Sequence, residues 1–381
     1  TIKFPPNYLP DIESQYHMDK KIGSGAFGTV YKAYYKEGDK EGEKDGKVVA
    51  LKLLDPKRIN RAELEQEVGL LTEISKGACH KNVVCYYGFF PSRFLGKPVM
   101  VVSMEFIDGN DIWDTLGPGN TVTWKAPVLY QTPKIRGKVQ DKIKLTDKPL
   151  QADLARHITD RLLQGLKFLH DMGIYHLDIK EGNVMVMKDG LEPVYVDFGL
   201  ACKARIPIGP YSCDKANGGS PYYMSKRRLI CASSGSDPCS EEDNRQADIW
   251  ALGMLLLKVL SRQELPDDAD PSLKFPAIQN WLKKNSNNLY IHDKSINNVI
   301  KTALSDDPTV TVDDLISIFN GSPSPTGYSD RALPTLPEIP DLPGLPDLPD
   351  STETDNELLD KTVLPLPVPQ PIKIRHRLKI N

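Results

Sequence analysis

The pattern of hydrophobic and polar positions predicts strands in the first third of the chain and helices farther on. Residues 48–54 and 99–106 are short apolar runs of the length expected for buried strands. Residues 61–74 place apolar side chains at helical spacing, and residues 154–170 repeat that pattern on one face of a longer helix. The run at 249–260 is apolar enough for a buried helix. Strands before helices favour an α+β fold in which a mostly β lobe precedes a mostly helical one.

Two segments break this pattern, and we expect both to be solvated insertions. Residues 36–47 form a charged run with three glycines, whereas residues 116–150 are long, dotted with proline and without a clear period. Composition changes again near the C-terminus, because 12 of the 31 prolines lie in residues 321–381. The predicted organisation is an N-terminal extension at 1–15, a β-rich lobe at 16–105, a helical lobe at 106–320 with its insert at 116–150, and a proline-rich tail at 321–381.

Within the tail, Leu-Pro and Ile-Pro pairs repeat at a spacing of three between Leu333 and Asp350. Polyproline II has three residues per turn, so the aliphatic side chains would align on one face and acidic side chains on another. Residues 372–380 then alternate apolar and basic side chains, as an edge strand would. We expect the tail to dock on its own domain or on a partner, and the alternative is a disordered linker with a basic end.

Charge and cysteine usage restrict the partners and the compartment. The 48 basic and 51 acidic residues give a net charge of −3, which provides no global attraction to nucleic acid or to an anionic membrane. The longest apolar stretch, 251–260, is ten residues, and a bilayer crossing needs about 20. Six cysteines without a CxxC pair favour reduced thiols and hence a cytoplasmic protein. The chain starts at Thr1, so removal of a targeting segment stays open.

A glycine-rich turn near the N-terminus is the first candidate for phosphate chemistry. Gly23, Gly25 and Gly28 would let backbone N–H groups approach phosphate oxygens where a Cβ would obstruct them. A plain hairpin turn is the alternative, and no helix follows at once, as a dinucleotide-binding fold requires. Lys52 lies among apolar neighbours on the next predicted strand and therefore needs an anion. Glu67, on the predicted helix, is one carboxylate that could pair with it.

A second cluster of motifs lies in the middle of the chain. The run His176-Leu177-Asp178-Ile179-Lys180-Glu181-Gly182-Asn183 precedes Asp197-Phe198-Gly199, with strand-like segments at 184–187 and 193–196 between them. Together with the glycine turn and the strand lysine, this order resembles the protein kinase superfamily. Further matches are Gly219 to Met224, similar to the substrate-facing loop of that family, and Asp248 to Gly253, similar to its buried central helix. The resemblance covers about residues 16–320 and implies a bilobal kinase fold.

The resemblance assigns chemical roles to several polar residues. Lys52, steadied by Glu67, would hold the α and β phosphates of ATP, while Asn183 and Asp197 would bind Mg²⁺. Asp178 would accept or orient the proton of the hydroxyl group on a protein substrate. Lys180 would lie near the transferring phosphate, as in the serine/threonine branch, and Ser220 points to the same branch. A helix cap or turn is the alternative role for either aspartate, and we assign His176 a structural role.

By the same resemblance, apolar side chains would enclose the adenine ring. The roof and floor would be Val30, Ala50 and Met185, and the hinge would be Met104, Glu105 and Phe106, with Met104 guarding the deeper pocket. Ordinary core packing is the alternative for each apolar side chain.

Two departures from the family affect the expected regulation. Leu177 stands where many kinases carry an arginine that pairs with a phosphate on the activation segment, and leucine cannot form that pair. Ser225-Lys226-Arg227 replaces the usual Ala-Pro-Glu, and residues 307–311 offer no late arginine for a buried ion pair, so the loop from Cys231 to Asp243 is expected to carry a different brace. Lys203 and Arg205 could still attract a phosphate. We therefore expect an active serine/threonine kinase that needs no activation-segment phosphorylation, the alternatives being a pseudokinase scaffold or an interaction protein acting through its tail.

Overall fold

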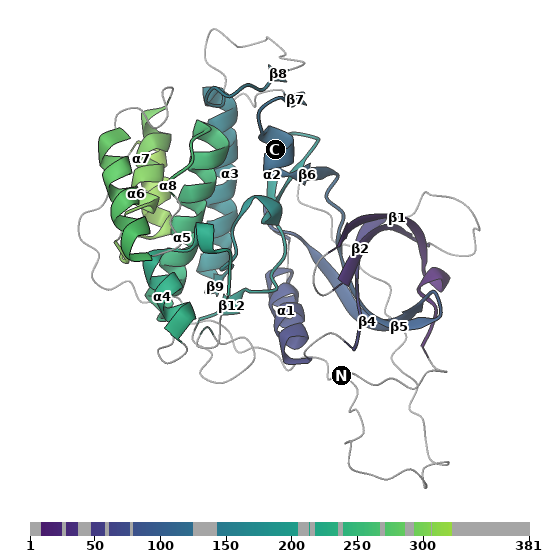
Figure 1. The fold of residues 1–381 in the computed structure, drawn as a ribbon. Coiled ribbons are helices and arrows are strands. Elements are labelled where there is room, and N and C mark those ends of the chain that lie inside the picture. The colour runs from purple at the N-terminus through teal and green to yellow at the C-terminus, as the bar shows by residue number, and fades with distance from the viewer. Residues whose placement is uncertain are drawn as a thin grey trace. The chain divides into compact units, whose positions relative to one another are not determined.

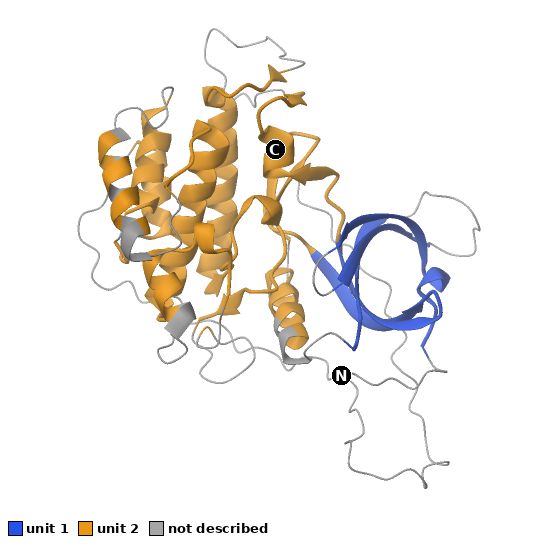
Figure 2. Cartoon of the chain, in the orientation of Figure 1, with its two compact units in different colours: residues 1–61, 86–104, 333–381 blue, residues 62–85, 105–332 orange. Residues whose placement is uncertain are grey.

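The computed structural model describes most of the chain up to Gly321, and these residues form two compact units (Figure 2). The described residues are 9–24, 28–36, 47–57, 61–76, 79–124, 143–204, 213, 218–234, 239–266, 271–285, 293–305 and 307–321. The first unit holds those within 1–61 and 86–104, and the second holds those within 62–85 and 105–332. The predictions for Gly25, for Arg205, for nearly all of the charged run 36–47 and for the tail beyond Gly321 lie outside the described residues.

The first unit is a five-stranded sheet with the order β1-β2-β3-β5-β4, which curls strongly in Figure 1. Its strands are β1 Tyr16–Ser24, β2 Gly28–Tyr35, β3 Val48–Leu54, β4 Tyr86–Phe94 and β5 Lys97–Glu105. The short turn η1, Ile12–Ser14, precedes β1 and contributes Ile12 to a core that also contains Tyr16, Val49, Leu51 and Val101. The predicted strands at 48–54 and 99–106 are therefore confirmed, the second with slightly earlier bounds.

The second unit is mainly helical. Its helices are α1 Arg61–Ile74, α2 Ile112–Leu116, α3 Ala152–Asp171, α4 Lys226–Ser234, α5 Glu241–Leu256, α6 Pro271–Asn285, α7 Lys294–Ala303 and α8 Val312–Phe319, with a π-helical turn, Leu257–Ser261, after α5. Its short strands are β6 Gly109–Asp111, β7 Thr121–Val122, β8 Ile143–Lys144, β9 Ile174–Tyr175, β10 Val184–Met187, β11 Pro193–Tyr195 and β12 Cys202–Lys203. They form three small sheets, in the orders β11-β10-β6, β12-β9 and β7-β8. The 3₁₀ turns η3 Glu181–Asn183 and η5 Pro221–Tyr223 complete the unit.

The predicted helices are confirmed, and local capping explains where the most buried one begins. Helix α5 starts at Glu241, well before the apolar run at 249–260, because Ser240 and Asp243 form a capping box that satisfies the free N–H groups of its first turn. Side chains along nearly the whole of α5 are buried. Strands followed by helices therefore form the α+β arrangement that the hydrophobic pattern favours.

The expectation that residues 116–150 are solvated is wrong for several apolar side chains in the described parts of that segment, although polar residues such as Lys144 and Lys148 are exposed. Val122, Trp124, Ile143 and Leu145 are all buried, and the ring of Trp124 lies 5.8 Å from that of His157 on α3. These apolar residues are too scattered in the sequence to form a periodic pattern. The β7-β8 pair nevertheless brings Val122 and Ile143 together, and Trp124 contacts α3.

The cysteines correct a second expectation. All six are paired, as Cys79–Cys85, Cys202–Cys213 and Cys231–Cys239, with Cα atoms 5.4, 5.0 and 5.3 Å apart. Such distances allow disulfides. The prediction of reduced thiols is therefore wrong, and the cysteines no longer support the prediction of a cytoplasmic protein. The described helices include none with both the length and the apolar character that a bilayer crossing demands.

Candidate active site

In the first unit, strand pairing gathers the residues predicted to contact nucleotide. Gly23 of β1 lies opposite Val30 of β2, and Val30 lies opposite Lys52 of β3. Gly28 must be glycine, because a Cβ there would lie 2.2 Å from the carbonyl oxygen of Leu53. Ala50 is buried, whereas Val30 and Lys52 are half-buried. The register therefore brings Gly23, Val30 and Lys52 side by side on neighbouring strands, near the strand ends that flank residues 25–27.

The other predicted nucleotide residues lie on several elements. Met104, half-buried on β5, lies opposite Tyr86 of β4 in the first unit. Glu105 donates its backbone N–H to the Cys85 carbonyl (2.8 Å), so the predicted hinge is joined to a disulfide-bonded cysteine. In the second unit, Phe106, Met185 on β10 and Glu67 on α1 are half-buried. The pairing of Lys52 with Glu67 stays a prediction.

The predicted catalytic residues converge on the Asp178 carboxylate. The Lys180 ammonium lies 2.7 Å from Oδ2, and the Asn183 side-chain amide donates to the same oxygen at 2.8 Å. The Ser220 hydroxyl donates to the other oxygen, Oδ1, at 2.8 Å, and itself accepts from Lys180 at 3.0 Å. Since Ser220 comes from a segment 42 positions farther along the chain, the fold brings together motifs that the sequence separates.

A buried carboxylate holds the loop that carries Asp178. Asp248 of α5, fully buried, accepts the backbone N–H groups of His176 (2.8 Å) and Leu177 (2.7 Å) and also contacts His170 Nε2 (3.0 Å). The two carboxylate oxygens of Asp248 thus hold the backbone at Leu177, which has the left-handed conformation (φ +62°) that is uncommon for a residue with a side chain. His176 is itself buried, with Nε2 3.0 Å from the Val196 carbonyl, as its assigned structural role requires.

Asn183 and Asp197 offer the oxygen ligands that Mg²⁺ prefers. The side-chain nitrogen of Asn183 donates to Asp178, so the side-chain oxygen, Oδ1, remains to face another partner. The backbone N–H of Val196 donates to the backbone carbonyl of Asn183 (3.0 Å). This bond places the exposed Asp197, the next residue, near Asn183. The described residues contain no cluster of three or more His, Cys, Asp or Glu side chains suited to a metal. The amide and carboxylate oxygens of Asn183 and Asp197 are donors of the kind that fit Mg²⁺, which commonly takes its other ligands from phosphate and water.

Aromatic and charged side chains support the turn η5 beside the catalytic loop. Lys274 is buried and donates to the Pro221 carbonyl at 3.0 Å, while the Lys258 ammonium lies 2.6 Å from Glu181. Burial would raise the pKa of the Glu181 carboxyl, but hydrogen bonds from Lys258 and Tyr223 outweigh it, so this pKa lies below its usual value. Glu181 is thus an anion that fixes this turn.

Sequence reasoning missed what surrounds Leu177. Its side chain packs with the Cys202–Cys213 disulfide in a buried apolar cluster that also contains Tyr175, Ala204 and Ala247. The possibility that Lys203 attracts a phosphate is not supported, because its side chain is 4 % exposed and pairs with Glu73 of α1. No cysteine motif signals this arrangement, since the two cysteines are 11 positions apart.

Comparisons with known proteins agree with this geometry. The protein kinase domain family matches residues 16–312. Serine/threonine-protein kinase pakE of Dictyostelium discoideum is 25 % identical over 325 residues, covering 80 % of this chain and 27 % of that protein. Human serine/threonine-protein kinase ULK3 is 27 % identical over 263 residues, covering 68 % and 44 %. The chain thus spans less than half the length of these relatives. With the family matched over most of its length, the chain belongs to the protein kinase domain family.

Proposed function

We propose that this chain is an active protein kinase that transfers the γ-phosphate of ATP to serine or threonine hydroxyls of protein substrates. The observation that supports it most is the Asp178 carboxylate, which accepts an aliphatic hydroxyl on one oxygen and contacts an ammonium on the other. A general base must lie within hydrogen-bond reach of the substrate hydroxyl, and the bond from Ser220 supports the view that Asp178 can accept from a hydroxyl of this kind. The relatives named serine/threonine-protein kinase support the same acceptor class.

The reaction would need positioning and charge neutralisation more than covalent help. When bound, Mg·ATP supplies an electrophilic γ-phosphorus whose charge the metal partly neutralises. Asp178 would orient the acceptor hydroxyl and take its proton, and Lys180 would stabilise negative charge on the phosphate oxygens. Asn183 and Asp197 would hold the metal. The bond between the γ-phosphorus and the β–γ bridging oxygen would break as the bond to the acceptor oxygen forms, so that ADP leaves, the acceptor becomes a phosphate ester and its proton passes to Asp178.

The nucleotide-binding residues fit this proposal as a second group. Lys52, steadied by Glu67, would hold the α and β phosphates beside the turn of Gly23, Gly25 and Gly28. The adenine ring would be enclosed by Val30, Ala50 and Met185, with hydrogen bonds from the backbone of the hinge formed by Met104, Glu105 and Phe106.

The proposal is tested by incubating the chain with γ-labelled ATP, Mg²⁺ and peptide mixtures that contain only serine, threonine or tyrosine as acceptor. We expect phosphoserine or phosphothreonine after acid hydrolysis. Phosphotyrosine alone would contradict the acceptor class. Binding of Mg·ATP without transfer would favour the pseudokinase scaffold.

We also propose that activity needs no phosphate on the activation segment, 202–219. The support is structural: apolar packing of Leu177 on the Cys202–Cys213 disulfide occupies the neighbourhood in which an arginine would bind a phosphate. The buried Lys203–Glu73 ion pair connects the same strand with α1. A covalent link and an ion pair would thus hold Cys202, Lys203 and Cys213 without modification.

Phosphatase treatment is therefore expected to leave the transfer rate unchanged within about twofold, since no charge-assisted contact to a phosphate is lost. The measurement is the initial rate before and after treatment, with mass spectrometry to confirm that phosphate is gone and inhibited phosphatase as the control. A collapse in rate that rephosphorylation within 202–219 reverses would refute this part of the proposal.

A further inference from the structure

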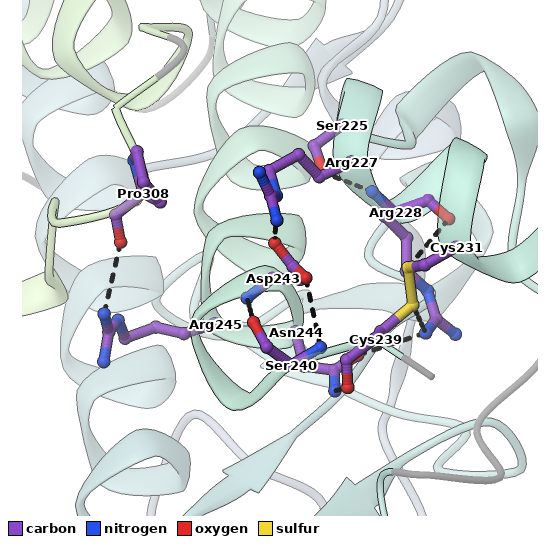
Figure 3. A network of polar contacts seen from close by, with 10 residues as sticks. All are labelled: Ser225, Arg227, Arg228, Cys231, Cys239, Ser240, Asp243, Asn244, Arg245 and Pro308. Carbon is purple, nitrogen blue, oxygen red and sulfur yellow. Dashed lines mark hydrogen bonds and ion pairs between the residues drawn. A yellow bond between two sulfur atoms is a disulfide. The ribbon is translucent and has the colours of Figure 1, made fainter. Parts of the chain in front are cut away.

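A fully buried arginine lies behind the acceptor side of the candidate site. Arg228, on α4, is 1 % exposed, and Figure 3 shows its guanidinium reaching toward the start of α5. Nη1 donates to Asn244 Oδ1 (3.1 Å) and to Cys239 Sγ (3.3 Å), and Nη2 donates to the Gly218 carbonyl (3.3 Å). A buried cation is costly unless it is well paired, and it contributes little net stability even then. Net stability alone therefore does not account for a buried arginine here, and its hydrogen bonds point to a role in geometry.

Gly218, which accepts a hydrogen bond from Arg228, lies two residues before Ser220, whose hydroxyl contacts Asp178. Gly218 and Gly219 have φ angles of +99° and +120°, which residues with side chains rarely adopt. A Cβ on Gly219 would lie 3.0 Å from the Leu177 carbonyl oxygen, so the close approach also needs glycine. Ser220 follows at once, with its hydroxyl on Asp178. Two glycines do not fix a backbone by themselves, so the bond from Arg228 to the Gly218 carbonyl is one contact that can limit where Ser220 lies.

The same arginine faces the site from inside. Arg228 lines one small cavity together with Asp178, Ser220, Tyr223 and Met224. Arg228, Ser220 and Asp178 therefore border the same cavity.

A disulfide fixes the partners of Arg228. Cys231 of α4 is bonded to Cys239, which precedes α5, and the Asn244 side chain donates to the Cys239 carbonyl at 3.4 Å (Figure 3). Arg227 makes a separate contact between the same two helices, an ion pair with Asp243, but its side chain is 64 % exposed whereas that of Arg228 is buried. The two neighbouring arginines thus offer a matched comparison.

We propose that Arg228, held by the Cys231–Cys239 disulfide, is a positioning residue that sets the Gly218 to Ser220 segment against Asp178 and so governs binding of the acceptor substrate. It would replace the brace for which the family uses the glutamate of Ala-Pro-Glu, a position that Arg227 occupies here. This inference rests on the proposed kinase function.

The kinetic test uses Arg228→Met, Arg228→Lys and the control Arg227→Met, with the peptide that the wild type phosphorylates best. Loss of the charged hydrogen bonds is expected to raise KM for peptide about tenfold in Arg228→Met. KM for ATP should stay within twofold, and Arg228→Lys should recover part of the loss because one ammonium can still reach one acceptor. Arg227→Met should match the wild type. An unchanged peptide KM in Arg228→Met, or an equal rise in Arg227→Met, would overturn the proposal.

The disulfide gives a second route if Arg228→Met does not fold. Replacing Cys231 and Cys239 together with serine should raise peptide KM in the same direction, whereas the same change at Cys79 and Cys85 should not. A rise only in the second pair would count against the proposal.

Amide hydrogen exchange tests the inference without phosphate transfer. Arg228→Lys and the Cys231/Cys239 serine variant should speed exchange in residues 218–224 several-fold while exchange in α3 stays at the wild-type rate. If the wild type transfers no phosphate but this exchange difference appears, the proposed function fails and the positioning claim stands. Unchanged exchange at 218–224 would refute the positioning claim alone.

Discussion

Replacing Asp178 with asparagine is expected to lower the rate of phosphate transfer by about 100-fold or more, because the variant cannot accept the proton of the acceptor hydroxyl. The amide keeps the size of the carboxylate, and its single oxygen can still accept from Lys180 while its NH2 group can donate to the Ser220 hydroxyl oxygen. Mg·ATP binding should therefore change little. The rate is measured in single turnover with the enzyme in excess, and Mg·ATP affinity is measured by calorimetry.

A matched control separates charge loss at the site from charge loss elsewhere. Asp171→Asn removes an exposed carboxylate that pairs with Lys167 on the surface of α3, and it should leave the rate within about twofold. Near-normal turnover in Asp178→Asn would contradict the mechanism.

Lys52→Met and Asp197→Ala are expected to weaken Mg·ATP binding by about tenfold or more, since each removes a charged group assigned to phosphate or metal. The two variants should differ in one respect. Lys52→Met should weaken binding with and without Mg²⁺, because the lysine contacts phosphate itself. Asp197→Ala should mainly remove the gain in affinity that Mg²⁺ provides.

Calorimetric titrations of ATP with Mg²⁺ and with a chelator distinguish these outcomes. Lys32→Met is the control, since it removes a half-buried lysine from β2 of the same sheet, where it pairs with Asp19 at 3.8 Å. Wild-type affinity in Lys52→Met or Asp197→Ala would remove those residues from the proposed nucleotide site.

Much of the fold could be predicted because local patterns and tertiary structure agree. The strand at 48–54 and the helix at 61–74 have the predicted bounds. The strand is a short apolar run and the helix has apolar side chains at helical spacing, and each is bounded by charged or turn-forming residues. The convergence of Lys180 and Asn183 on Asp178 could be expected as well, since all three lie within six residues of one another.

Features that depend on long-range packing could not be predicted. Cys231 and Cys239 carry no pairing signature in the sequence, and they meet only because α4 and α5 pack together. Arg228 is one of three consecutive basic residues, Lys226, Arg227 and Arg228, and no local pattern tells which of them is buried. Trp124 is buried because the β7-β8 pair brings its segment onto α3, which an irregular apolar pattern does not reveal.

Single-turnover transfer by phosphate-free protein saturated with Mg·ATP tests the central claim most directly. The proposal predicts that labelled phosphate appears on serine or threonine of the acceptor peptide, and that Asp178→Asn, equally saturated, forms about 100-fold less in the same time. A wild type that binds Mg·ATP fully yet transfers no faster than Asp178→Asn would contradict it.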